Sequence, residues 1–61
     1  MKLKSFIKHL RKHNCVLDEE GAKHSKFINI ENGKAATVPR HKEINDFLAI
    51  KICKELEIPL P

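Results

Sequence analysis

The chain is organised around the stretch GAKHSKF at residues 21–27. In this stretch Gly21 stands three residues before His24, and Lys23 and Lys26 lie on either side of the histidine. Histidine is the side chain best placed to move protons near neutral pH, and lysines beside it can hold a phosphate or an anionic transition state. His24 is therefore a candidate catalytic residue, although an exposed histidine between lysines is more often a solvated strand residue. We expect Gly21 to adopt a positive φ angle that lets the chain reverse just before His24.

The residues from Lys23 to Ile30 have the length of a β-strand, and their side chains divide between two faces. Phe27 is expected to face the core, which leaves His24 and Lys26 on the open face because neighbouring side chains of a strand point to opposite sides. Ile28 shares the open face in this assignment. The strand is therefore expected to present its histidine and lysine to solvent or to a substrate.

A further strand is predicted on each side of this one. Cys15–Leu17 is a short apolar run that predicts a brief first strand, and Asp18–Gly21 predicts a tight loop after it. Asn32-Gly33 is a strong hairpin signal that favours a type I′ turn. The third strand, Lys34–Val38, is expected to end at Pro39 because proline cannot donate a hydrogen bond to a ladder. Strands in this order predict an antiparallel meander.

Helices are predicted near both ends of the chain. Apolar residues at positions 3, 6, 7 and 10 form one face of a helix over Lys2–His13, and Asn14 is expected to end it in the left-handed conformation. Asn45 is a good N-cap for a second helix that runs to Glu57. Its apolar side is assigned to Phe47, Leu48, Ile52 and Leu56, broadened by Ala49 and Cys53. The predicted fold is an α+β single domain over residues 1–61, with two helices on one face of a three-stranded antiparallel sheet.

Size and charge restrict the function. A chain of 61 residues with only three phenylalanines as aromatics builds a thin core, because a domain of this size buries only about 60% of its unfolded surface. A polymer held on the surface therefore fits better than a small molecule in a deep pocket. The net charge is +4 and the pI is near 9.3, which favours nucleic acid or an acidic protein as partner, although +4 is also ordinary for solubility.

The two cysteines, Cys15 and Cys53, form no C-x-x-C pair. No apolar run is long enough for a signal peptide or a membrane span, so we expect free thiols and a cytoplasmic protein. His9 and His13 lie four residues apart with Cys15 beyond them, a spacing that can bind zinc. No second ligand pair follows at a zinc-finger spacing, so we expect no metal site.

Arg40-His41-Lys42 is a cationic run directly after the third strand. It is either a solvated loop, a phosphate clamp or a contact for an acidic partner protein. The cationic residues expected to bind a nucleic acid are therefore Lys23, Lys26, Arg40, His41 and Lys42.

The chain resembles the HicA family, the small toxins of HicA–HicB toxin–antitoxin pairs. The resemblance covers nearly the whole chain and rests on Gly21-x-x-His24, Asn32-Gly33, Val38-Pro39-Arg40-His41 followed by Glu43-Ile44, and Ile52-Cys53-Lys54-Glu55-Leu56 ending at Ile58-Pro59. It implies a fold like a double-stranded-RNA-binding domain, an mRNA-cleaving activity and a HicB antitoxin that blocks it. The family's motif histidine carries over onto His24. Some members have serine where this chain has Ala22, so no role for a hydroxyl carries over.

RNA supplies its own nucleophile, the 2′-hydroxyl, so we expect cleavage without a metal or another cofactor. His24 is expected to transfer a proton as acid or base, while Lys23, Lys26 and Arg40 hold the phosphate. If His24 is the base, the acid is water, a lysine such as Lys23 or Lys26, or His41. Two alternatives remain open. One is a module of the same fold that binds RNA without cutting it, and the other is a protein-interaction domain whose basic face meets an acidic partner.

Overall fold

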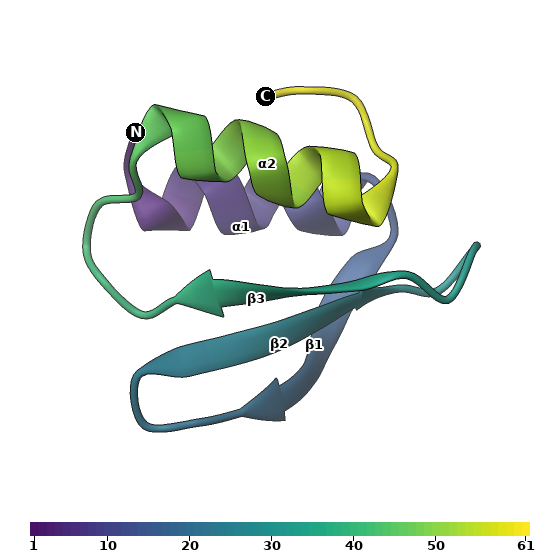
Figure 1. Ribbon diagram of the computed structural model, residues 1–61, viewed down its shortest axis with the longest axis horizontal. Helices are drawn as coiled ribbons and strands as arrows, with labels where there is room; N and C mark the ends of the chain where they lie inside the picture. Colours follow the sequence, from purple (N-terminus) through teal and green to yellow (C-terminus); the bar gives the residue numbers. More distant parts are fainter.

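The structure of the chain, a computed structural model, describes residues 1–61. The elements in order are α1 (Leu3–Lys12), β1 (Cys15–Glu20), β2 (His24–Asn29), β3 (Ala35–Pro39) and α2 (Asp46–Leu56). The strands form one antiparallel sheet in the order β1-β2-β3, and Figure 1 shows both helices on the same side of it. The predicted α+β fold, α-β-β-β-α with two helices on one sheet face, is confirmed. Neither helix has the length and apolar character that crossing a bilayer requires.

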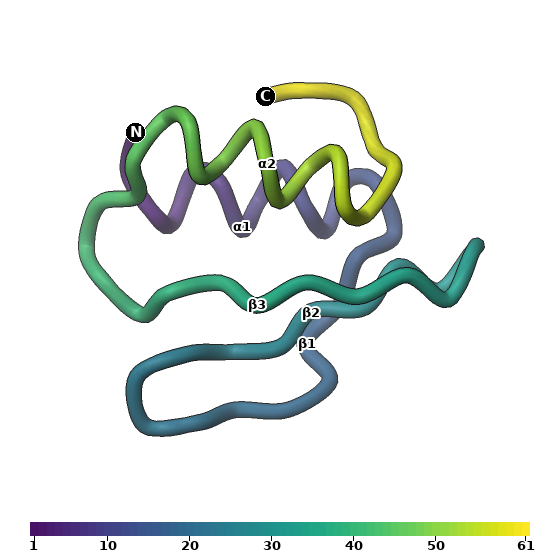
Figure 2. Tube along the Cα trace, in the orientation of Figure 1, coloured from purple at the N-terminus to yellow at the C-terminus, as the bar shows by residue number.

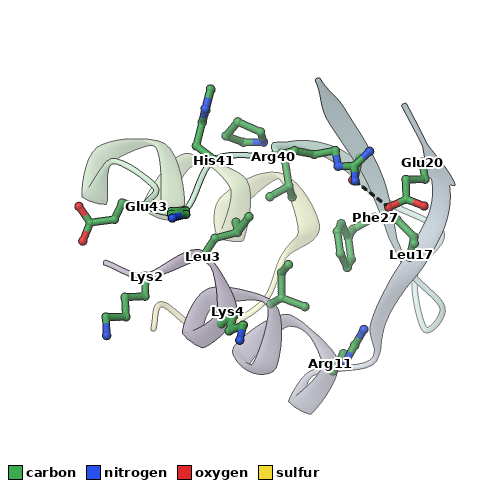
Figure 3. Close-up of a pocket in the computed structure, with 15 residues that line it drawn as sticks. Lys2, Leu3, Lys4, Arg11, Leu17, Glu20, Phe27, Arg40, His41 and Glu43 are labelled. Atoms are coloured by element: carbon green, nitrogen blue, oxygen red, sulfur yellow. Dashed lines mark ion pairs between the residues drawn. The ribbon is translucent and has the colours of Figure 1, made fainter. Parts of the chain in front are cut away.

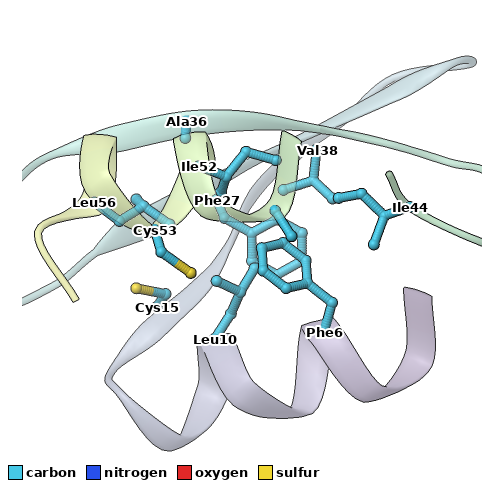
Figure 4. Close-up of a cluster of buried hydrophobic side chains, with 11 residues drawn as sticks. Phe6, Leu10, Cys15, Phe27, Ala36, Val38, Ile44, Ile52, Cys53 and Leu56 are labelled. Carbon is cyan, nitrogen blue, oxygen red and sulfur yellow. The ribbon is translucent and has the colours of Figure 1, made fainter. Parts of the chain in front are cut away.

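The core lies between the sheet and the two helices (Figure 4). Eleven apolar side chains are buried there: Phe6, Leu10, Cys15, Phe27, Ala36, Val38, Ile44, Ala49, Ile52, Cys53 and Leu56. Phe27 is only 3% exposed, so the prediction that it faces the core is confirmed. Each large apolar side chain buried in this way contributes roughly 1.5–3 kcal/mol, which makes this layer the main source of stability.

The first strand is longer than predicted. Residues 18–20, expected as a loop, belong to β1 and pair with β2, with Glu19 opposite Lys26 and Glu20 opposite Ser25. A register shift lies between Leu17 and Glu19. Acidic residues are rare in strands, but here Glu19 lies opposite Lys26 and Asp18 forms an ion pair with the same lysine. Oppositely charged cross-strand pairs stabilise a sheet. The prediction of a loop was wrong because the composition of residues 18–20 does not reveal that β2 lies beside them and pairs with them.

The β2–β3 hairpin differs from the expected type I′ turn. Such a turn needs positive φ at both central residues, whereas only Gly33, with φ of 75°, is left-handed there. The loop is instead organised by asparagine side chains. Asn29 Oδ1 accepts from the Glu31 N–H at 2.9 Å, and both Asn29 and Asn32 donate through Nδ2 to the Leu56 carbonyl at the end of α2. Figure 2 shows the hairpin tip at the same end of the molecule as the end of α2, whose free carbonyl these amides satisfy.

The helix ends agree with the sequence, but one face assignment does not. Asn14 has a left-handed φ of 66° after α1, and Asn45 Oδ1 caps α2 by accepting from the Phe47 N–H at 2.8 Å. Phe47 itself is 83% exposed, so its assignment to the apolar side was wrong. The residues of α2 that enter the core are Ala49, Ile52, Cys53 and Leu56. Phe47 precedes Ala49 by two residues, about 200° around the helix, and therefore points away from the sheet.

A short backbone contact, not foreseen from the sequence, holds the segment after β3 against the start of α1. The Leu3 N–H donates to the Lys42 carbonyl at 2.9 Å, and Lys2 and Glu43 form an isolated antiparallel bridge. Ile44 is buried directly after this contact. The residues between β3 and Ile44 are therefore held over the N-terminal turn of α1.

Candidate functional site

The turn between β1 and β2 sets the position of His24. The Gly21 N–H donates to the His24 carbonyl at 2.8 Å. A Cβ atom built on Gly21 would lie 2.8 Å from the same oxygen, closer than real Cβ contacts come. Gly33 is the one glycine with positive φ, so the expectation that Gly21 supplies a left-handed turn was wrong. Glycine is required at this position because the chain closes directly onto His24 with no space for a side chain.

His24 opens β2 on the face of the sheet opposite the helices. Its Cα pairs with that of Pro39 on β3, and its side chain is exposed. Lys26 follows two residues later on the same face, also exposed and opposite Thr37. The predicted open-face placement of His24 and Lys26 is confirmed. Lys26 Nζ lies 3.6 Å from Asp18 Oδ2 on β1, an ion pair that the sequence did not predict.

Arg40 links the end of β3 to the turn before His24. Its backbone N–H donates to the Lys23 carbonyl at 3.0 Å. Its guanidinium contacts the end of β1 and the turn that follows it. Nη1 donates to the Gly21 carbonyl at 2.6 Å, and Nη2 lies 3.3 Å from Glu20 Oε1. Arg40 and Lys23 are therefore neighbours of the Gly21–His24 turn. Sequence reasoning missed Glu20 as a partner, because the pair joins the end of β1 to the residue after β3 and no local pattern indicates it.

His41 and Lys42 are exposed but lie elsewhere. Together with Arg40 they border a groove of about 1000 Å³ between α1, the helix-facing side of the sheet and the segment after β3 (Figure 3). His24 does not line this groove. The predicted RNA-binding residues therefore divide into two groups, Lys23 and Lys26 beside His24, and His41 and Lys42 at the groove, with Arg40 between them.

The histidine and cysteine residues considered as zinc ligands do not converge. His9 Nε2 lies 2.7 Å from the Pro59 carbonyl oxygen, and the His9 and His13 rings meet edge to face with centroids 4.6 Å apart. The Cys15 thiol points into the core, where it is fully buried. No group of three or more potential ligand side chains lies together in the chain.

Both cysteines are free, as predicted. Burial raises the pKa of the Cys15 thiol, and the Glu31 carboxylate adds to the effect. Burial likewise raises the pKa of Cys53, with Cys15 as the smaller cause. The thiols therefore stay protonated near neutral pH and act as small apolar core groups.

Comparison with known proteins gives one match. The model of the family described as the HicA toxin of bacterial toxin–antitoxin systems matches residues 3–58. No curated protein and no solved structure matches the chain. The matched region includes both helices, all three strands and the Gly21–His24 turn. The chain therefore belongs to the HicA family, the toxins of bacterial toxin–antitoxin systems.

Proposed function

We propose that this toxin is an endoribonuclease that cuts mRNA, with His24 as the proton-transfer group, and that a HicB-like antitoxin neutralises it. The observation that carries the proposal is the closed Gly21–His24 turn, which holds an exposed imidazole next to several cations. Membership in a toxin family supports it. The chain acts as one domain over residues 1–61, and its mRNA substrate places it in the cytoplasm.

The chemistry needs no group beyond RNA and protein side chains. The 2′-oxygen of a ribose attacks the neighbouring phosphorus and loses its proton, and the 5′-oxygen of the next nucleotide leaves and gains one. His24 performs one of these two transfers, a contribution of about 10²–10⁴-fold for a single positioned group. The products are a 2′,3′-cyclic phosphate and a 5′-hydroxyl. Lys23 is the nearest cation in sequence and forms no ion pair, so it is free to meet the phosphate.

Lys26 and Arg40 bind the RNA backbone when phosphate groups replace the carboxylates with which they are paired in the free protein. Both are paired with exposed carboxylates, those of Asp18 and Glu20. Exposed ion pairs of this kind contribute only about 0–1 kcal/mol, so a phosphate can replace the carboxylate at small cost. A phosphate also suits the two-pronged guanidinium of Arg40. His41 and Lys42 extend this cationic surface away from His24.

A comparison of His24→Ala with His41→Ala tests the assignment. Both residues are exposed imidazoles, so each substitution should leave the circular dichroism spectrum and the melting temperature unchanged. Expression of the wild type should arrest growth and deplete mRNA, whereas His24→Ala should do neither. His41→Ala should lose only part of this activity, because His41 lies at the groove that His24 does not line.

The alternative, an RNA-binding module without catalysis, predicts a different result. In that case purified wild type would bind RNA without cutting it, and His24→Ala would keep both the affinity and the toxicity. A folded His24→Ala protein that remains fully toxic would contradict the catalytic assignment.

A further inference from the structure

The groove on the helix side of the sheet has an apolar floor that no part of the chain covers. Leu3 and Ile7 of α1 and Leu17 of β1 line it. Leu17 lies opposite the buried Phe27 in the sheet register, yet it is 45% exposed. A leucine on the core-facing side that remains this open leaves apolar surface in the groove between β1 and α1 (Figure 3). The floor is therefore an apolar surface with space above it.

Cations surround this floor. The charged side chains that line the groove are Lys2, Lys4, Arg11, Arg40, Lys42, Glu20 and Glu43. Glu20 is already engaged by Arg40, whereas Lys4 and Arg11 form no ion pair. Lys4 and Arg11 are seven residues apart, two helical turns, and so project from the same side of α1. The rim is left with an excess of unpaired positive charge.

An apolar floor bordered by unpaired cations fits an acidic polypeptide better than a nucleic acid. Single-stranded RNA is held by aromatic side chains on which bases stack, and the phenyl ring in the floor, Phe27, is 3% exposed and offers no such face. Aliphatic side chains of a peptide would bury against Leu3, Ile7 and Leu17. Carboxylates beside them would meet Lys4 and Arg11.

We propose that this groove docks an acidic segment of the antitoxin that carries aliphatic or aromatic anchors, on the side of the sheet away from His24. This inference rests on the proposed function only for the identity of the partner. Apolar contacts at the floor set the lifetime of the complex, and the rim charges raise the association rate. Binding of the antitoxin therefore depends in part on Leu17, Lys4 and Arg11, which the proposed cleavage does not use.

A matched pair of double variants on α1 tests the proposal. Lys4→Glu with Arg11→Glu reverses two charges at the groove, whereas Lys8→Glu with Lys12→Glu makes the same change in net charge at exposed positions of the same helix outside it. The probe is the purified protein encoded by the reading frame beside the toxin gene. Its association with each toxin variant is measured over a range of ionic strength. A third variant, Leu17→Asn, tests the floor.

We expect the Lys4 and Arg11 double variant to raise the Kd of the toxin–antitoxin complex about tenfold, because two rim contacts are lost. The change should come mainly from slower association, and the association rate should depend less on salt. Leu17→Asn should raise the Kd about tenfold through faster dissociation. The Lys8 and Lys12 variant should stay within about threefold of the wild type.

Three results would overturn the proposal. The first is that the toxin does not bind the antitoxin at all. The second is that the wild type and both double variants bind the antitoxin with equal affinity. The third is that the groove variants keep their affinity for the antitoxin but lose affinity for a single-stranded RNA oligonucleotide. The last would make the groove a nucleic-acid site. Cleavage by the free toxin is a separate readout. If cleavage is absent or independent of His24 the proposed function fails, while the binding comparison still reports on the groove.

Discussion

Replacing Gly21 by alanine tests the turn that holds His24. The new Cβ would lie 2.8 Å from the His24 carbonyl oxygen, and ordinary van der Waals contact begins at 3.4 Å, so the two must separate by 3.4 − 2.8 = 0.6 Å. Both contacting groups belong to backbone, which does not move aside as a flexible side chain does. The same movement stretches the hydrogen bond from the Gly21 N–H to that oxygen.

The expected cost is about 1–3 kcal/mol of the free energy of unfolding, the range for an added methyl group in a packed position. The free-energy cost of weakening this hydrogen bond is included in the range, since one such bond contributes about 0.5–1.5 kcal/mol. For a domain of about 60 residues, each kcal/mol lowers the melting temperature by roughly 4–8 °C. Displacement of His24 should also slow RNA cleavage per folded molecule by more than about tenfold, because a misplacement of about 1 Å costs up to 10²-fold.

The other glycine provides the control. Gly33 has φ of 75° with nothing within 4 Å of an added Cβ, so Gly33→Ala should cost about 1–2 kcal/mol through left-handed strain alone. Its cleavage rate per folded molecule should equal that of the wild type. Urea denaturation and single-turnover cleavage of a labelled RNA measure both quantities. If Gly21→Ala kept the wild-type stability and rate, or if both variants lost cleavage equally, the turn would not be what positions His24.

Three further tests address the fold. Phe47→Ser should change the melting temperature little, because the ring is 83% exposed, whereas Phe27→Ala should cost about 3–5 kcal/mol; equal losses would contradict the orientation of α2. Asn29→Ala should destabilise by about 1–3 kcal/mol in urea denaturation, since it leaves a carbonyl at the end of α2 with one donor fewer, and a neutral result would remove the hairpin anchor. Because burial raises the pKa of Cys15 and Cys53 above the ordinary 9.0, the folded state keeps these protons longer than the unfolded state. Stability should therefore fall as the pH rises above about 9, less steeply in Cys53→Ala, and an identical slope in both proteins would contradict the burial.

Features that depend on local pattern were predictable from the sequence. The spacing of apolar residues predicted α1, Asn14 and Asn45 marked helix ends, and alternation placed Phe27 inside and His24 outside. Each of these depends on residues within one turn of helix or one strand. Such short-range signals reach the right result because the tertiary packing agrees with them.

Features that depend on distant partners were not predictable. Residues 18–20 extend β1 because β2 lies alongside, and Asn29 is buried because the end of α2 needs a donor. Phe47 was placed on the apolar side by its chemistry, but the position of the sheet selects the side around Ala49. The groove likewise lies between α1, the sheet and the segment after β3, an arrangement that no local sequence pattern encodes.

The central claim is that His24 moves a proton in a cleavage that RNA itself begins. The most direct test is end-group analysis of RNA cut by purified wild type and by His24→Ala in the presence of EDTA. We expect the wild type to leave a 2′,3′-cyclic phosphate and a 5′-hydroxyl, and His24→Ala to slow this cleavage by at least about 10²-fold while it remains folded. A 5′-phosphate product, or loss of wild-type activity on chelation with recovery on addition of zinc or magnesium, would contradict the claim.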